Sequence, residues 1–216
     1  MNIAGKKTTQ VKRSSYRHGD LYRTLLEAAV QLARKGGADA IVLREVTRQA
    51  GVAPNAAYRH FADRDALVRA VGMAAQSASA VEIEKEISMI SETADMVWNA
   101  RARLRAVGTG YLRFAFAEPG LFKVAFSIHN DLSNAANPES AGESGLTPYQ
   151  HLGLALDMLV EAGALTQERR IFAEIFAWSA VHGFAMLVLE GPFRFLDEKQ
   201  IDVIGQRLID VVERGL

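Results

Sequence analysis

The sequence predicts an all-α protein, and three observations support this fold class. Apolar residues recur three and four positions apart through almost every segment of the 216 residues, which is the spacing of one helix face. No segment shows the strict alternation of polar and apolar residues that a half-buried strand needs. The breaks fall at residues that end helices, namely Gly36-Gly37, Glu118-Pro119-Gly120 and Gly191-Pro192.

The N-terminal third predicts helices arranged around a tight turn. Asp20 is a suitable N-cap for the first helix, and a pair of glycines ends it. A short helix follows Gly51, and Asp63 is placed to cap a longer one. The predicted helices are 20–35, 43–50, 54–60 and one that runs from Asp63 towards residue 90.

The rest of the chain predicts a second set of helices, 95–117, 121–127, 148–163, 168–190 and 197–214. The stretch 129–147 is rich in Asn, Ser, Gly and Pro, a composition typical of a mobile loop. Residues 171–189 are apolar on nearly all sides, but Glu174 and His182 interrupt them. We therefore expect a buried helix there rather than a membrane span.

The composition limits the chemistry that the chain can perform. It contains no cysteine, and none of its five histidines lies three or four positions from another, so we expect neither a metal site nor a catalytic thiol. "GTGYLR" at 108–113 resembles half of a dinucleotide-binding motif but follows no predicted strand. We predict no catalytic residues, no cofactor and no enzyme activity. The N-terminus lacks the apolar run of a signal peptide, which favours a cytoplasmic protein.

The formal net charge is zero, but the charge is unevenly distributed. Residues 1–70 contain 13 Lys and Arg against 6 Asp and Glu, whereas residues 71–216 contain 12 against 19. A basic N-terminal third joined to an acidic remainder is typical of a polyanion-binding module attached to a module that does not bind polyanions.

Residues 43–61, LREVTRQAGVAPNAAYRHF, have the spacing of a helix-turn-helix. The first helix carries a small residue, Thr47, where the second helix would cross it. Gly51 lies four residues later and can adopt the left-handed conformation that reverses the chain. Ala57 and Phe61 of the second helix would then pack on the first.

This segment, together with "YRHGDLYRTLLEAA" and the later "AWSAVHGFAML", resembles the tetracycline-repressor (TetR) family of bacterial regulators, in the subgroup with a C-terminal Trp, His, Gly signature. The resemblance implies a homodimer with two DNA-binding domains, each followed by a helical domain that usually binds a small molecule. The sequence departs from the family pattern at Val42, Thr47 and Ala53. Val42 stands where the family commonly has Ser or Thr, and Ala53 where it commonly has Ser, which removes two hydroxyl contacts to phosphate. The implied organisation is a basic flexible arm (1–17), a helix-turn-helix domain (18–70) and a helical ligand-binding and dimerisation domain (71–216).

The expected partner is double-stranded DNA with a palindromic operator. The short helix would enter the major groove, where Asn55 can bond base edges and Ala56 can meet a thymine methyl. Asn55 is equally suited to a turn, and the basic arm could be a solubilising tail instead of a DNA contact. The residues expected to bind DNA are Arg44, Arg48, Pro54, Asn55, Ala56, Tyr58, His60 and Arg64.

The second domain is rich in aromatic side chains, which predicts an apolar or aromatic small-molecule effector. Trp178 and His182 share a helix face and could line the pocket or belong to the core. The candidate ligand contacts are Trp98, Phe114, Phe126, His129, His151, Phe176, Trp178 and His182. The last two helices are expected to form the homodimer interface. We therefore expect a repressor that its ligand releases from DNA, with an architectural DNA-binding dimer as the alternative.

Overall fold

The computed structural model describes residues 18–126 and 135–216, and of residues 18–20 only the backbone. These residues form α-helices joined by turns and two short 3-10 helices, with no strand in the described ranges, so the predicted all-α fold class is confirmed. The elements are α1 (His18–Gly36), η1 (Gly37–Ala40), α2 (Leu43–Gln49), α3 (Pro54–Ala57), α4 (Arg64–Ser88), α5 (Met96–Ala117), α6 (Pro119–Ala125), η3 (Pro138–Ser140), α7 (Pro148–Glu161), α8 (Gln167–Arg170), α9 (Ala173–Leu189) and α10 (Glu198–Gly215).

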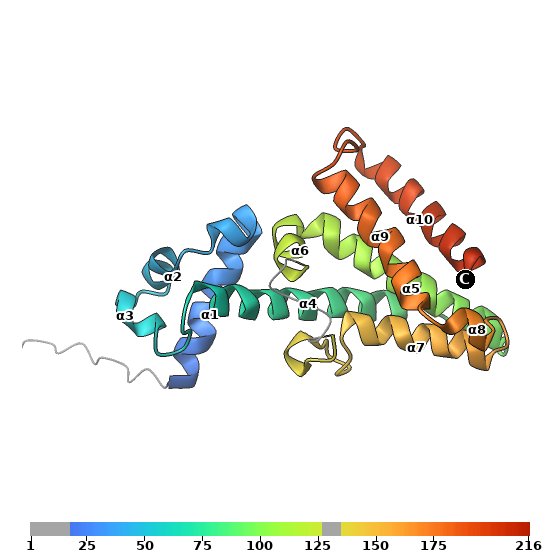
Figure 1. Ribbon diagram of the computed structural model, residues 1–216, viewed down its shortest axis with the longest axis horizontal. Helices are drawn as coiled ribbons and strands as arrows, with labels where there is room; N and C mark the ends of the chain where they lie inside the picture. The colour runs from blue at the N-terminus through green and yellow to red at the C-terminus, as the bar shows by residue number, and fades with distance from the viewer. Residues whose placement is uncertain (1–17, 127–134) are drawn as a thin grey trace, which may run out of the picture.

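Helix α4 runs through most of the length of the molecule (Figure 1). Helices α1, α2 and α3 surround its N-terminal end, while α5, α7, α9 and α10 lie around its C-terminal half. The predicted domain boundary at residue 70 falls inside this continuous helix. One cluster of buried side chains extends from Leu25 of α1 to Phe122 of α6 and Ile209 of α10. The two groups of helices are therefore joined by shared apolar packing as well as by the chain.

The helix ends follow from local residues. The Asp63 side chain accepts a hydrogen bond from the Ala66 amide at 2.7 Å, as the sequence predicts. Asp197 caps α10 in the same way and forms a capping box with Gln200. Val42 and Ala53, at the N-termini of α2 and α3, provide no side-chain cap.

Helices α4 and α5 cross in close contact at Gly110. A Cβ atom on Gly110 would lie 2.5 Å from Cα of Ile83 in α4. This is far below van der Waals contact, so only glycine allows the two backbones to approach this closely. The crossing fixes α5 against α4 and helps to define the space between α5, α7 and α9.

Two predicted segments differ from the structure. The helix predicted at 168–190 is divided into α8 and α9 at Phe172, whose φ of 61° lies in the left-handed region. Arg170, just before this break, is held by Asp157 (2.8 Å) and Glu174 (2.7 Å). No glycine or proline marks the site, so the apolar periodicity appeared continuous.

The second difference lies in the predicted mobile loop 129–147. Residues 129–134 are outside the described range, but 135–147 contain η3 and are bound to α4. The Ser77 hydroxyl donates to the Ala141 carbonyl at 2.7 Å, and the Glu84 carboxylate accepts from the amides of Glu143 and Ser144. Side chains of α4, distant in sequence, thus order a stretch whose own composition predicted a loop without structure.

Among the helices of residues 18–126 and 135–216, none is both long and apolar enough to cross a membrane. In the same ranges no three His, Asp or Glu side chains come together in a group that could hold a metal ion.

Candidate functional site

The first candidate site is the surface formed by α2 and α3. Val46 and Ala57 are fully buried between these helices, and the Thr47 hydroxyl donates to the Arg44 carbonyl at 3.0 Å. Gly51 has a φ of 68°, the left-handed conformation predicted for the turn. The Val52 amide bonds to the Thr47 carbonyl at 3.0 Å and closes the turn. The predicted helix-turn-helix is therefore present.

The outer side of α3 presents several of the predicted DNA contacts. Pro54 and Asn55 are exposed, Tyr58 is 57% exposed, and Ala56 is half-buried. His60 is also half-buried, with its ring 6.3 Å from that of Tyr22 in α1. The α-helix ends at Ala57 rather than at residue 60, because Tyr58 to His60 form a turn.

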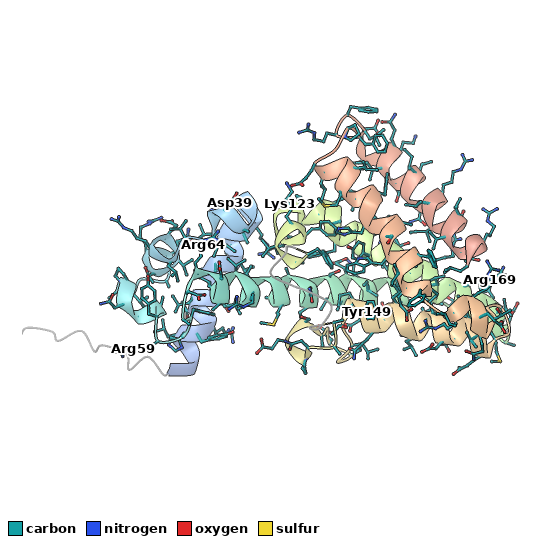
Figure 2. All side chains as sticks on the ribbon, viewed as in Figure 1. Asp39, Arg59, Arg64, Lys123, Tyr149 and Arg169 are labelled. Carbon is teal, nitrogen blue, oxygen red and sulfur yellow. The ribbon has the colours of Figure 1, made fainter. Side chains whose placement is uncertain are left out.

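Arg59 is a cation on this surface that the sequence analysis did not select. Its side chain is exposed at the end of α3 (Figure 2). The sequence could have indicated Arg59, because it lies between Tyr58 and His60, which are both among the residues expected to bind DNA. A guanidinium there can contact the DNA backbone without reading the sequence.

The two arginines of α2 differ in their surroundings. Arg48 forms an ion pair with Glu45 (2.5 Å), and hydrogen bonds from Arg48 and Gln49 lower the pKa of the Glu45 carboxyl to about 2. Both groups face solvent, so the pair adds little stability. Arg44 is exposed and forms no ion pair with any described residue. The charge of Arg44 is therefore less compensated than that of Arg48.

Arg64, one of the residues expected to bind DNA, also makes hydrogen bonds within the protein. In the structure, Nε donates to the Ile41 carbonyl (2.9 Å) and Nη2 to the Ala38 carbonyl (2.5 Å). The Ala38 carbonyl also accepts from the Ile41 amide at 3.1 Å, so Arg64 adds a second partner at the end of η1. Arg64 thus fixes the start of α4 to the segment that precedes α2 (Figure 2).

The second candidate site is a cavity of about 340 Å³ between α4, α5, α7, α9 and α10. Its volume falls within the range of small-molecule sites. Polar groups on its wall come from Gln76, Tyr111, Thr147 and Tyr149. The apolar wall includes Ile83, Leu104, Val107, Leu152, Val181 and Ile209.

Trp178 connects this cavity to a buried chain of hydrogen bonds. Its Nε1 donates to the Tyr111 hydroxyl at 3.0 Å, and that hydroxyl donates to Nδ1 of His182, 2.8 Å away. Burial raises the pKa of Tyr111 and lowers that of His182, so both groups are uncharged. Trp178 lines the cavity and also packs in the core, whereas His182 lies beyond Tyr111 among Phe122 and Phe126.

The other predicted ligand contacts are dispersed. Phe126 is on the cavity wall. Trp98 is 45% exposed in a groove between α5 and α10, Phe114 is buried elsewhere in the core, and Phe176 is 66% exposed on the outside of α9. His129 is outside the described residues. The observed positions differ from the predicted ones because helical periodicity shows which residues share a helix face. It does not show which part of the protein that face packs against.

His151, the remaining candidate, is buried but is not on the cavity wall. Its Nε2 lies 3.3 Å from the Glu84 carboxylate and 3.4 Å from the Ser144 hydroxyl. His151 therefore joins α7 to α4 beside the 142–145 turn. Tyr111, in contrast, lies on the cavity wall although the sequence analysis did not include it among the candidates.

Half-buried His182 predicts a pH-dependent stability. An unfolded histidine has a pKa of about 6.5, and burial lowers the pKa of His182 in the folded protein. Below this unfolded value the unfolded chain binds more protons, so stability falls as the pH decreases. We expect a lower urea midpoint at pH 5.5 than at pH 7.5, at fixed protein concentration, and a smaller difference in His182→Gln. An identical pH dependence in the variant would contradict this.

Family models match both parts of the chain. Residues 25–71 match the model for bacterial regulatory proteins of the tetR family, and residues 104–212 match that of the tetracyclin repressor-like C-terminal domain. A search of curated proteins found no match. The fold and the N-terminal surface define a helix-turn-helix transcriptional regulator. The chain belongs to the TetR family.

Several solved structures share the fold. A protein with unknown function from Rhodococcus sp. RHA1 is 26% identical, with a TM-score of 0.65 and coverage of 94% of this chain and 99% of that one. The transcriptional regulator FadR from Bacillus subtilis, in complex with stearoyl-CoA, is 14% identical with a TM-score of 0.65, covering 90% and 99%. A TetR variant from Acinetobacter baumannii AYE, in complex with minocycline, is 16% identical with a TM-score of 0.56, covering 89% and 94%.

Proposed function

We propose that this TetR-family regulator is a homodimeric repressor that an apolar small molecule releases from a palindromic operator. Residues 18–70 would bind DNA and residues 71–216 would bind the effector and form the dimer, with the arm 1–17 as a further basic segment. The DNA contacts would be Arg44, Arg48, Pro54, Asn55, Ala56, Tyr58, His60, Arg64 and the additional Arg59. Arg64 also fixes the start of α4 to the segment before α2 through Ile41 and Ala38.

The observation that carries this proposal is the shared helix α4. Its first turn is fixed by Arg64 to η1 and to Ile41, just before α2, and Gln76 and Ile83 of the same helix lie on the cavity wall. A ligand that binds one position of α4 more tightly than another increases the population of that position. Because α4 is continuous, the DNA-binding end of the helix changes with it. Small molecules in the FadR and TetR complexes support the use of this fold for effector binding.

Sequence reading and phosphate binding should separate by mutation. Asn55 is exposed on α3 and can bond a base edge, so Asn55→Ala should weaken binding to a selected operator by about 1 to 3 kcal/mol and leave a random duplex unaffected. Arg59→Ala, the matched control, should weaken both duplexes and reduce the salt dependence. Fluorescence anisotropy at several salt concentrations measures both. Equal losses on both duplexes for Asn55→Ala would place the base contacts elsewhere.

Release by the effector is tested through reciprocity. A thermal-shift screen of apolar compounds identifies a ligand, and calorimetry then measures its affinity with and without operator DNA. If the ligand weakens DNA binding, DNA must weaken ligand binding by the same factor. Ligand affinity that does not change with DNA would exclude release by that compound. A screen without hits would favour the architectural alternative.

A further inference from the structure

The described wall of the cavity carries no formal charge. None of the lining residues within 18–126 and 135–216 is Asp, Glu, Lys, Arg or His. Its two phenols belong to Tyr111 and Tyr149, and the surrounding wall is mainly aliphatic and aromatic. An ionised group placed there would lose its hydration without gaining a counter-charge from this wall, which is strongly unfavourable. The wall therefore selects for an uncharged molecule.

Most hydrogen-bonding groups on this wall already have protein partners. The Trp178 indole donates to Tyr111, and Tyr111 donates to His182. The Thr147 hydroxyl donates to the Ala135 carbonyl at 2.5 Å and accepts from the Gln150 amide at 3.3 Å. These side chains keep little capacity for a ligand.

Gln76 is different because half of its carboxamide has no protein partner. One N–H of Nε2 donates to the Ala125 carbonyl at 2.9 Å. The second N–H and Oε1 form no hydrogen bond with any described residue, although the side chain is half-buried and lies on the cavity wall. A carboxamide in this state presents a donor and an acceptor next to each other, which complements a neutral carbonyl, hydroxyl or amide group.

Gln76 also stands at a junction between the cavity and the DNA-binding helices. The carbonyl that it contacts belongs to Ala125, the last residue of α6. Helix α6 packs against α1 and η1 of the N-terminal group. A ligand that bonds to Gln76 therefore competes with, or reinforces, the connection between α4 and α6.

From these observations we propose that the Gln76 carboxamide is the specificity-determining contact for an uncharged, largely apolar effector that carries one carbonyl, hydroxyl or amide group. This proposal rests on the proposed function, because it assigns a chemistry to the same effector site. Tyr149 is the alternative contact, since its hydroxyl also forms no hydrogen bond with a described residue.

The experiment uses three probes of one shape: 2-naphthamide, 2-naphthoate and naphthalene. The cavity has more than twice the roughly 150 Å³ of an apolar cavity that admits benzene, so two fused rings are a suitable size. Equilibrium dialysis against the full-length protein at pH 7.5 gives each affinity. Gln76→Met keeps the length of the side chain without its hydrogen bonds, and Tyr149→Phe tests the alternative contact.

We expect wild type to bind 2-naphthamide and to bind 2-naphthoate at least about tenfold more weakly. Gln76→Met should bind 2-naphthamide about three- to tenfold more weakly than wild type while its affinity for naphthalene is unchanged, which also shows that the cavity is intact. Tyr149→Phe, which tests the alternative contact, should weaken 2-naphthamide binding less than Gln76→Met does. Absence of 2-naphthamide binding, an unchanged affinity in Gln76→Met, equal losses in the two variants, or tight 2-naphthoate binding would each overturn the proposal.

Operator binding measured in the same samples separates this inference from the proposed function. If 2-naphthamide binds through Gln76 but does not weaken operator binding, the inference about Gln76 is supported. The proposal that a ligand in this cavity releases the operator is then contradicted. If the probes release the operator equally in wild type and Gln76→Met, the proposed release is supported and the inference about Gln76 is contradicted.

Discussion

Phe176→Lys is expected to dissociate the homodimer at micromolar concentration. Phe176 is 66% exposed on the outside of α9, which lies beside α10 on one flank of the molecule (Figure 1). In a two-fold dimer each substitution occurs twice. Loss of two buried phenylalanines costs about 3 to 6 kcal/mol, which raises the dimer dissociation constant about 10²- to 10⁴-fold, before the cost of burying two ammonium groups.

The apolar surface of these helices supports this expectation. The exposed large apolar residues there are Phe172, Ile175, Phe176, Leu187, Val203, Ile204 and Val211. A patch of this kind marks an interface. A Cβ atom on Gly183 would meet nothing within 4 Å in the monomer, so α9 also offers a place where a second helix can approach closely.

Met89→Lys is the matched control, since Met89 is 58% exposed at the C-terminal end of α4, outside this patch. A lysine there suits the helix dipole, so the control should remain dimeric. Sedimentation velocity over a concentration series measures both variants. Operator affinity should fall with the dimer, because two half-sites are bound together. If the dimer dissociation constant of Phe176→Lys equals that of Met89→Lys, the interface lies elsewhere.

The helices were predictable because their ends depend on neighbouring residues. Asp63 and Asp197 cap helices through amides three positions away. The start of α6 was predicted less well, because Pro119 and Gly120 were assigned to a break whereas Pro119 begins the helix. The break at Phe172 depends on Arg170 and its contacts to Asp157 and Glu174. A local pattern contains no information about such contacts between helices.

The candidate sites show the same limit. The turn at Gly51 and the exposed side of α3 follow from a contiguous motif, which is why sequence reasoning located them. Gln76 is one of two α4 residues on the cavity wall, beside apolar Ile83. Only its contact with Ala125 and its place on the wall show its importance. Arg64 is another such case, because its carbonyl partners lie 23 and 26 positions away.

Gly120→Ala is expected to weaken both folding and operator binding, because Gly120 brings the backbones of α6 and α1 together. A Cβ atom there would lie 2.3 Å from the Ala33 carbonyl oxygen and 2.6 Å from that of Arg34. These are backbone atoms of a helix, so α1 and α6 must move apart, at a cost of about 1 to 3 kcal/mol. The ion pair between Arg34 and Glu118 (3.1 Å) spans the same contact and would be stretched.

Two other glycines separate the effects on stability and on DNA binding. Gly110→Ala introduces a similar clash, 2.5 Å from Cα of Ile83, but between α4 and α5. It should reduce the free energy of unfolding by a comparable amount and leave the operator affinity of the folded protein nearly unchanged. A Cβ atom on Gly153 of α7 would meet only Oε1 of Glu174 at 3.6 Å and Nη2 of Arg170 at 4.0 Å. Gly153→Ala should therefore stabilise the protein by about 0.5 to 1 kcal/mol.

Urea unfolding and operator anisotropy, both at 25 °C and fixed dimer concentration, measure the three variants. Gly120 belongs to α6, the helix that Gln76 contacts, and lies against α1 of the DNA-binding group. Its substitution therefore changes how the two groups of helices are placed. If Gly120→Ala and Gly110→Ala lowered operator affinity equally, loss of folded protein would explain both, and the α1–α6 contact would have no special part in DNA binding. If Gly120→Ala alone lowers it, that contact couples the effector domain to the operator.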